Sequence, residues 1–184
     1  SDTASMTITV NPVPIAAITG NTSVCSGSST TLTANPSGNN YSWSTGSTAQ
    51  NITVTPTVNT TYTVIVSAGS CSDTANVTVT VFPTPTVAIT SVNPLCNGQS
   101  TGTAAANPSG GTAPYTYLWS NAQTNQTATG LAAGTYTVVI TDANNCTATQ
   151  TITITQPTAI SVTTNSTQTN CSGNTGTATA TPSG

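Results

Sequence analysis

The 184-residue chain contains no lysine, arginine or histidine, and its only acidic residues are Asp2, Asp73 and Asp142. A chain without cationic side chains cannot displace the counterions around phosphates, so this sequence is not expected to bind nucleic acid. It also lacks the basic residues that attract anionic lipid, and it has no apolar run long enough to span a bilayer. The sequence therefore predicts neither a nucleic-acid partner nor insertion into a membrane.

The missing residue types also argue against an enzyme. A nucleophilic serine or threonine would have no histidine or lysine to activate it. Glutamate is absent, and no two of the three aspartates are expected to converge on one place as the carboxylate pair of a glycosidase does. The five cysteines are widely spaced rather than clustered as Cys-x-x-Cys, so neither a metal site nor a cofactor is predicted.

The residues that are present favour strands. Threonine is abundant, and serine, asparagine, glycine and alanine fill much of the remaining sequence. Threonine is β-branched and suits a pleated surface, whereas no stretch has the charged face of an amphipathic helix. The sequence therefore predicts an all-β protein made of several small domains.

One plan of motifs recurs along the chain at intervals of roughly 70–75 residues, which indicates a tandem array. A Cys-x-Gly motif opens each round, at Cys25, Cys96 and Cys171. A Tyr-x-Trp strand follows in the first two rounds, at 41–43 and 117–119. Strands with alternating apolar residues close each of these rounds.

The repeat divides the chain into four segments. Residues 1–14 are expected to be the closing strand and linker of a preceding module, and 158–184 the start of a further repeat. Residues 15–82 and 83–157 are each expected to form a complete module. Short strands separated by turn residues at this spacing are typical of two packed antiparallel sheets, so the fold class is a string of Ig-like β-sandwiches, like beads.

Several motifs in the second module resemble the SprB-type repeat, which occurs in very large surface adhesins of gliding Bacteroidetes. They are Cys96-Asn-Gly, the loop at 108–115, Tyr117-Leu-Trp119-Ser and the stretch at 131–146. Residues 15–82 resemble the related Ig-like or PKD-like modules of proteins secreted by the same bacteria. The resemblance implies type IX secretion, a stalk-like β architecture and an extracellular, cell-surface location.

These observations predict a structural and adhesive role, as a repeat segment of a long extracellular filament or gliding adhesin. The expected partners are neighbouring repeats of the same chain and a surface polysaccharide or the substratum. A passive spacer in a secreted enzyme is the first alternative, because such modules also occur beside catalytic domains. A second alternative is an ice-binding surface, since Thr-x-Thr runs recur along the strands.

Cysteines at regular places in small modules indicate disulfides and an oxidising compartment. Cys25 and Cys71 bracket the first complete module, and Cys96 and Cys146 bracket the second. The sequence therefore predicts the disulfides Cys25–Cys71 and Cys96–Cys146.

Both ends of the sequence are expected to be cuts through a longer array. Ser1 aligns with Ser72, inside a closing strand, and the third round stops before its tryptophan strand. Cys171 is therefore expected to be unpaired within this segment, with its partner further along the same polypeptide.

Five residues fit either a binding role or a structural one. Trp43 and Trp119 could stack on sugars, but their equivalent positions favour a core tryptophan near a disulfide. Tyr62 and Tyr136 open equivalent strands after a turn and are interpreted as tyrosine corners. Asp142 could bind calcium, yet one carboxylate is too few for a strong site, which favours a turn-forming aspartate.

Two threonines are candidates for glycosylation. Asp2-Thr3-Ala4 and Asp73-Thr74-Ala75 resemble the Asp-Thr/Ser-apolar acceptor of O-glycosylation in Bacteroidetes. Glycans on Thr3 and Thr74 would help to keep a nearly uncharged surface soluble. The alternative is a tripeptide that was copied with its module and carries no sugar.

Overall fold

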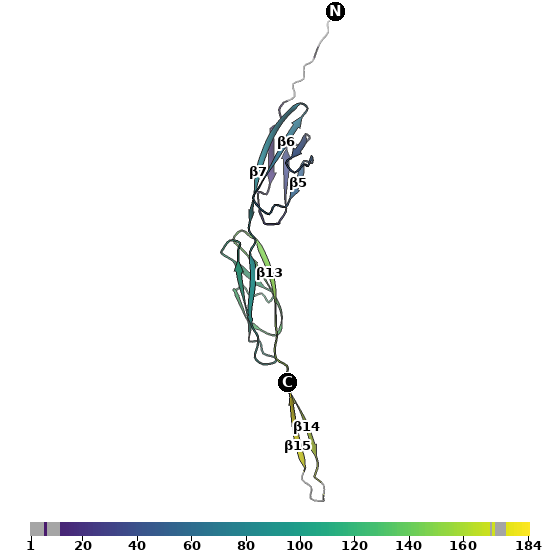
Figure 1. Ribbon diagram of the computed structural model, residues 1–184, viewed down its shortest axis with the longest axis vertical. Helices are drawn as coiled ribbons and strands as arrows, with labels where there is room; N and C mark the ends of the chain where they lie inside the picture. Colours follow the sequence, from purple (N-terminus) through teal and green to yellow (C-terminus); the bar gives the residue numbers. More distant parts are fainter. Residues whose placement is uncertain (1–5, 7–11, 170, 172–175) are drawn as a thin grey trace, which may run out of the picture. The chain divides into compact units, whose positions relative to one another are not determined.

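A computed structural model describes residue 6 and residues 12–169, 171 and 176–184 of the chain (Figure 1). Every regular element among these residues is a strand, and none of them belongs to a helix long and apolar enough to cross a membrane. The chain divides into two compact units. The first comprises Ser1–Thr84 with Asn144–Cys146, and the second comprises Pro85–Ala143 with Thr147–Gly184.

The first unit contains two sheets. One has the order β1 (Ala17–Gly20), β3 (Thr30–Asn35), β5 (Asn51–Val54), and the other β2 (Ser23–Cys25), β7 (Cys71–Phe82), β6 (Thr60–Ala68), β4 (Asn40–Trp43). All neighbours are antiparallel except β2, which runs parallel to the end of β7. This combination of two sheets is the sandwich that the spacing of short strands predicts.

Side-chain alternation builds the core of the first unit. In β6, Tyr62, Val64 and Val66 are buried on one face, whereas Thr61 and Ile65 on the other face are exposed. Leu32 and Ala34 of β3 are fully buried on the facing sheet. Each large apolar side chain buried in this way contributes roughly 1.5–3 kcal/mol relative to exposure.

The second unit repeats the arrangement. Its sheets have the orders β11 (Thr127–Leu131), β9 (Gly102–Ser109), β8 (Thr86–Val92), and β10 (Thr116–Trp119), β12 (Gly134–Thr141), β13 (Thr147–Ile154). Its buried core consists of Ala104, Ala106, Trp119, Ala128, Leu131, Val138, Ile140 and Ile154. Small alanines face large residues, which allows the two layers to pack closely.

The last two strands, β14 (Ser161–Thr167) and β15 (Thr177–Ser183), form a two-stranded sheet of their own. Their register matches that of β8 and β9: Ser161 lies opposite Ser183, as Thr86 lies opposite Ser109. The hydroxyls of each of these two pairs lie 2.8 Å apart. The hairpin therefore has the register of the first two strands of the second unit, and all its strand residues are exposed.

Candidate functional site

The disulfide of the described structure joins Cys25 to Cys146, with an S–S distance of 1.99 Å and a Cα–Cα distance of 5.6 Å. The predicted pairs Cys25–Cys71 and Cys96–Cys146 are therefore wrong. Cys96 and Cys171 carry exposed free thiols. The partner that the sequence predicts for Cys171, further along the polypeptide, stays a prediction.

The length of β7 explains why Cys25 does not pair with Cys71. Cys25 lies opposite Phe82 at one end of β7, and Cys71 lies opposite Ala68 at the other end. The two positions are 82 − 71 = 11 residues apart on an extended strand, or roughly 36 Å. A disulfide needs Cα atoms within about 7 Å, so residues that bracket the module in sequence lie at its opposite ends.

The same reasoning applies to Cys96 and Cys146. Cys146 directly precedes β13, whose eight residues span roughly 23 Å. The residues after Cys96 are bonded beyond the far end of that strand: the Asn97 side-chain amide donates to the Pro157 carbonyl, and the Gly98 N–H donates to Gln156 Oε1, both at 2.9 Å. Cys146 thus precedes one end of β13, whereas Cys96 lies beside the residues that follow its other end.

Both tryptophans belong to the cores of their units. Trp43 is 3% exposed and Trp119 is 1% exposed. The Trp43 ring N–H donates to the Ala49 carbonyl at 2.8 Å, and the Trp119 ring N–H donates to the Asn125 carbonyl at 3.0 Å. Neither ring face is available to a sugar, so the core interpretation is correct.

The loop after each tryptophan leads to a glutamine whose side-chain amide makes an equivalent hydrogen bond in both units. These two bonds were not predicted from the sequence. The Gln50 side-chain amide donates to the Ala34 carbonyl at 3.2 Å, and that of Gln126 donates to the Ala106 carbonyl at 2.9 Å. These bonds satisfy the backbone of β3 and β9 near the loops. The signal was a glutamine seven residues after each tryptophan.

Tyrosine hydroxyls fix several turns. Tyr136 donates to the Ala132 carbonyl at 3.2 Å, which confirms a tyrosine corner at this position. Tyr62 lies in the first core and is 7% exposed. The structure adds two similar bonds that the sequence did not reveal: Tyr41 and Tyr115 each donate to a carbonyl five residues upstream.

Asp142 is 4% exposed, and its carboxylate accepts a hydrogen bond of 2.9 Å from the Thr112 N–H. In the part of the chain that the structure describes, no three side chains of the His, Cys, Asp or Glu type lie close enough to hold a metal ion. The carboxylate thus fixes the loop before Cys146, which is the turn-forming role.

Asp73 and Thr74 belong to the predicted glycosylation tripeptide. Asp73 accepts hydrogen bonds of 2.8 Å from the N–H groups of Ala16 and Thr74, and these bonds, with Ala16 the stronger cause, hold its pKa below the usual 3.8. Thr74 is exposed. Thr3 lies outside the described residues.

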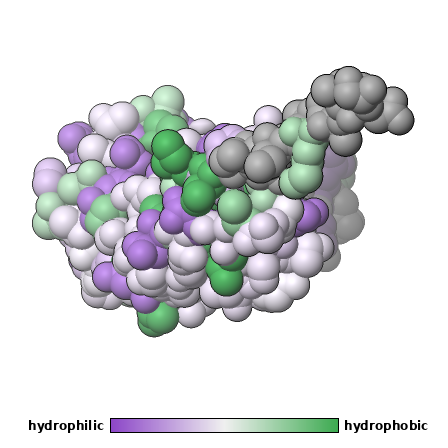
Figure 2. Space-filling model, turned by 90° about the horizontal axis from the view of Figure 1, so that it is seen from above, coloured by the Kyte–Doolittle hydropathy of each residue, from purple (hydrophilic) through white to green (hydrophobic). Residues whose placement is uncertain are grey.

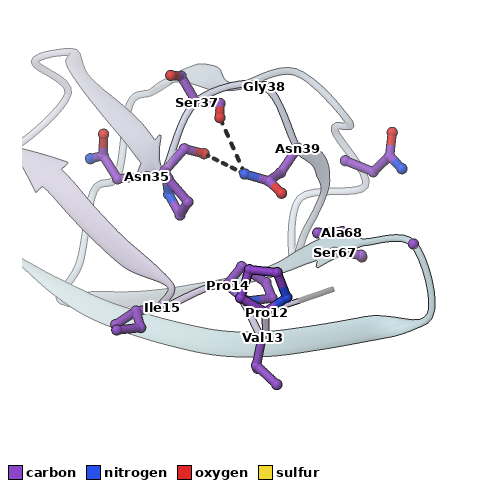
Figure 3. A pocket seen from close by; sticks show the side chains of 13 residues that line it. Pro12, Val13, Pro14, Ile15, Asn35, Ser37, Gly38, Asn39, Ser67 and Ala68 are labelled. Atoms are coloured by element: carbon purple, nitrogen blue, oxygen red, sulfur yellow. Dashed lines mark hydrogen bonds between the residues drawn. The ribbon is translucent and has the colours of Figure 1, made fainter. Parts of the chain in front are cut away.

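A hollow of about 860 Å³ lies at one end of the first unit (Figure 3). Residues 12–15, 35–40 and 67–69 line it. The Asn39 amide donates to the carbonyls of Pro36 and Ser37, both at 3.2 Å, and so closes the loop along its rim. The lining offers amides, carbonyls and proline rings but no titratable side chain, so it provides no group for acid–base catalysis.

The outward faces of both units carry rows of hydroxyl groups. Figure 2 accordingly shows a surface in which pale residues of intermediate hydropathy predominate. Threonines on neighbouring strands lie opposite one another, with their hydroxyls within hydrogen-bonding distance. The pairs are Thr31–Thr53 (3.3 Å), Thr61–Thr78 (2.8 Å), Thr135–Thr153 (3.4 Å) and Thr137–Thr151 (3.1 Å). These hydroxyls are oriented toward each other across the strands.

Comparisons with known proteins agree with this architecture. Residues 88–124, in the second unit, match the family model of the SprB repeat. The chain is similar to the C-terminal 282-residue fragment of intimin, solved in complex with the intimin-binding domain of the translocated intimin receptor. The identity is 19%, the TM-score is 0.50, and the match covers 83% of this chain and 67% of that fragment.

A second similar structure is the N-terminal eight Ig domains of Down syndrome cell adhesion molecule, at 12% identity and a TM-score of 0.50. The match covers 73% of this chain but only 26% of that one. No curated protein matches the sequence. At these identities the likeness concerns the fold, and the units are Ig-like β-sandwiches.

Proposed function

We propose that this chain is a structural and adhesive repeat segment of a long extracellular surface filament. The observation that carries the proposal is the repeat itself: two sandwiches built on one plan, with the same tryptophan and glutamine hydrogen bonds. Modules that fold around their own cores extend a chain without requiring one large core. The match of residues 88–124 to the SprB repeat supports a gliding adhesin of Bacteroidetes as the parent protein.

The proposed location is the cell surface, reached through type IX secretion. The Cys25–Cys146 disulfide supports an oxidising compartment, because such bonds rarely persist in the cytosol. We also propose that the chain is divided into four segments, which end at residues 14, 82, 157 and 184. Glycans on Thr3 and Thr74 belong to the same proposal, and intact-mass measurement of the native protein would detect them.

The proposed ligand is an uncharged one, either a surface polysaccharide or the substratum. The outward hydroxyls and amides suit hydrogen bonding to sugar hydroxyls, and the chain has no cationic side chain to recognise an acidic ligand. This site would be spread over the sheet faces rather than concentrated in a cleft.

Retention of coated particles under flow tests adhesion directly. Beads carrying the protein are passed over agarose, cellulose and glass, and beads carrying an unrelated Ig-like sandwich serve as the control. Retention above the control on at least one surface is expected. Retention equal to the control on all three would refute adhesion and favour the alternative, a passive spacer in a secreted enzyme.

A further inference from the structure

We propose that Cys96 is a cross-linking site, which forms a disulfide with the cysteine of an Asn-Asn-Cys hairpin loop in another module of this type. Cys25 provides the precedent. It opens the first complete round of the repeat, as Cys96 opens the second, and it is bonded to Cys146, the last residue of Asn-Asn-Cys. Cys146 lies 121 residues later, in the following round of the repeat.

The turns that carry Cys25 and Cys96 have the same conformation. Gly27 and Gly98, two residues after each cysteine, both have φ = 77°, a left-handed value that favours glycine. The N–H of Ser28 donates to the Cys25 carbonyl at 2.9 Å, and the N–H three residues after Cys96 donates to its carbonyl at 3.4 Å. The backbone therefore presents both sulfur atoms from the same kind of turn.

Each turn is also anchored at the end of the closing strand of its own unit. The Ser26 N–H donates to the Phe82 carbonyl at 2.9 Å, at the end of β7. The Asn97 and Gly98 bonds to Pro157 and Gln156 hold the second turn just beyond β13. Cys96 is thus fixed in the second unit at the position that Cys25 occupies in the first.

A hollow beside Cys96 has room for the incoming loop. It has a volume of about 830 Å³, and its lining includes Cys96, Pro157, Ile160 and the end of β15 at 182–184. The lining carries no charged side chain, and Ile160 is 81% exposed. An apolar hollow next to an exposed thiol is an observation independent of the cysteine itself.

The second unit shows how a loop of the expected type packs at such a place. Past the end of β9, the Thr112 N–H donates to the Asp142 carboxylate, and the Ala143 N–H donates to the Thr112 carbonyl at 2.9 Å. The strand β15 is equivalent to β9, because β14 and β15 pair in the register of β8 and β9. We therefore expect the Asn-Asn-Cys loop of the module that contains β15 to pack just past the end of that strand. Asn145 has φ = 62°, a left-handed value that asparagine adopts more readily than most residues. We therefore expect the loop that bonds Cys96 to carry asparagine directly before its cysteine.

Formation of this disulfide from two thiols requires an oxidant, and the oxidant proposed is glutathione disulfide. The Cys96 thiolate attacks it, forms a mixed disulfide and releases one glutathione. The loop cysteine then attacks the Cys96 sulfur and releases the second glutathione, so two thiols and one glutathione disulfide give one protein disulfide and two glutathione thiols. This inference rests on the repeat and the observed bond, and it holds whether or not the segment is adhesive.

The test extends the full chain after Gly184 by a copy of its own residues 111–157. Gly184 is equivalent to Gly110, so the extension completes the third round and supplies a second Asn-Asn-Cys loop. A Thr147→Ser change in the copy marks its peptide by mass. After refolding in a glutathione buffer, pepsin digestion without reduction is expected to yield the Cys96 peptide joined to the marked peptide, and Cys96 is expected to lose its reactivity toward iodoacetamide.

Two variants of the extended chain provide controls. Cys171→Ala is expected to leave the new bond intact, whereas Cys96→Ala is expected to leave the copied cysteine open to alkylation. A Cys96 that stays reactive beside a folded extension, or a copied cysteine that bonds Cys171 instead, would overturn the proposal. Fluorescence of the copied Trp119 reports whether the extension folds. If it does not fold, an extension copied from residues 39–84 replaces it, with Gly69→Asn and Ser70→Asn in the copy so that Asn-Asn precedes the copied Cys71.

The unextended chain gives a separate readout. In glutathione disulfide it is expected to carry glutathione on Cys96 and to remain a monomer on a non-reducing gel. A covalent dimer joined through Cys96 of two molecules would show that the site links copies of the chain, and would refute a partner from an Asn-Asn-Cys loop.

Discussion

At the scale of single residues, the tryptophans show how a binding motif and a structural motif differ. Each ring is buried between the sheets, and each ring N–H is satisfied by a carbonyl six residues further along the chain. A buried N–H without a partner costs roughly 1–3 kcal/mol. The loop after each tryptophan avoids this cost because it supplies the carbonyl that accepts from the ring N–H. An exposed stacking platform would need neither burial nor this bond.

Replacing Trp119 by phenylalanine should therefore destabilise the second unit by about 2–4 kcal/mol. The change removes the bond to the Asn125 carbonyl and leaves a cavity beside Val138 and Ile140. Chemical denaturation followed by circular dichroism measures the loss. Leu118→Ala, on the outward face of the same strand and 56% exposed, should change the free energy of unfolding by less than about 1 kcal/mol. Equal effects of the two substitutions would contradict a core role for Trp119.

The carboxylate of Asp73 makes the stability of the first unit depend on pH. Its bonds from the Ala16 and Thr74 N–H groups lower its pKa below the usual 3.8, so the unfolded chain takes up a proton at higher pH than the folded one. The resulting stabilisation is present above pH 3.8 and is lost as the pH falls through the lower pKa of the folded state. Asp73→Asn should abolish this part of the acid sensitivity.

Thermal unfolding at pH 6 and at pH 2.5 measures the effect. The melting temperature of the unaltered protein should fall more between the two pH values than that of the Asp73→Asn variant. Asp2 and Asp142 are the same in both proteins, so the difference between them isolates Asp73. Equal falls would show that the Asp73 hydrogen bonds are not formed in solution.

At the scale of strands, β7 explains the largest error of the sequence reasoning. The alternation of Ala75, Val77, Val79 and Val81 correctly predicted a closing strand. It did not reveal that β2 runs parallel to the end of β7, which places Cys25 opposite Phe82 and separates it from Cys71 by the length of the strand. Pairing by proximity in sequence fails here because the ends of a long strand are far apart in space.

Thiol mapping of three single variants distinguishes the two pairings. Cys25→Ala should expose the Cys146 thiol to iodoacetamide, whereas Cys96→Ala and Cys71→Ala should leave Cys146 protected. Loss of the bond, which closes a loop of 121 residues, should cost on the order of 5 kcal/mol in the chain-entropy model. Alkylation of Cys146 in the Cys96→Ala variant would instead restore the pairing expected from the sequence.

The parts of the fold that could be predicted are those with a strong local signal. The strand alternation, the turn residues and the equivalent tryptophans gave the sandwich fold and the core position of Trp43 and Trp119. Contacts that depend on register could not be predicted, such as the Asp73 bond to the Ala16 N–H, which joins residues 57 apart. The glutamine bonds could have been found, because Gln50 and Gln126 recur at the same distance from a tryptophan.

At the scale of the whole molecule, the absence of cationic side chains removes every side-chain ion pair. Cohesion comes from the buried cores, the strand hydrogen bonds and the hydroxyl and amide contacts of the surface. Salt screens interactions between charges but has little effect on these terms at moderate concentration. The net charge of -3 over 184 residues also gives only weak repulsion between distant aspartates.

The melting temperature should therefore change by less than about 2 °C between 20 and 500 mM sodium chloride, since a change of 1 kcal/mol corresponds to about 4–8 °C in a domain of this size. A double substitution provides the control. Thr137→Lys with Thr151→Glu places opposite charges at directly paired positions of β12 and β13, and this variant should lose stability as salt is added. A rise of several degrees in the unaltered protein would mean that repulsion among the three aspartates, rather than packing and hydrogen bonding, limits its stability.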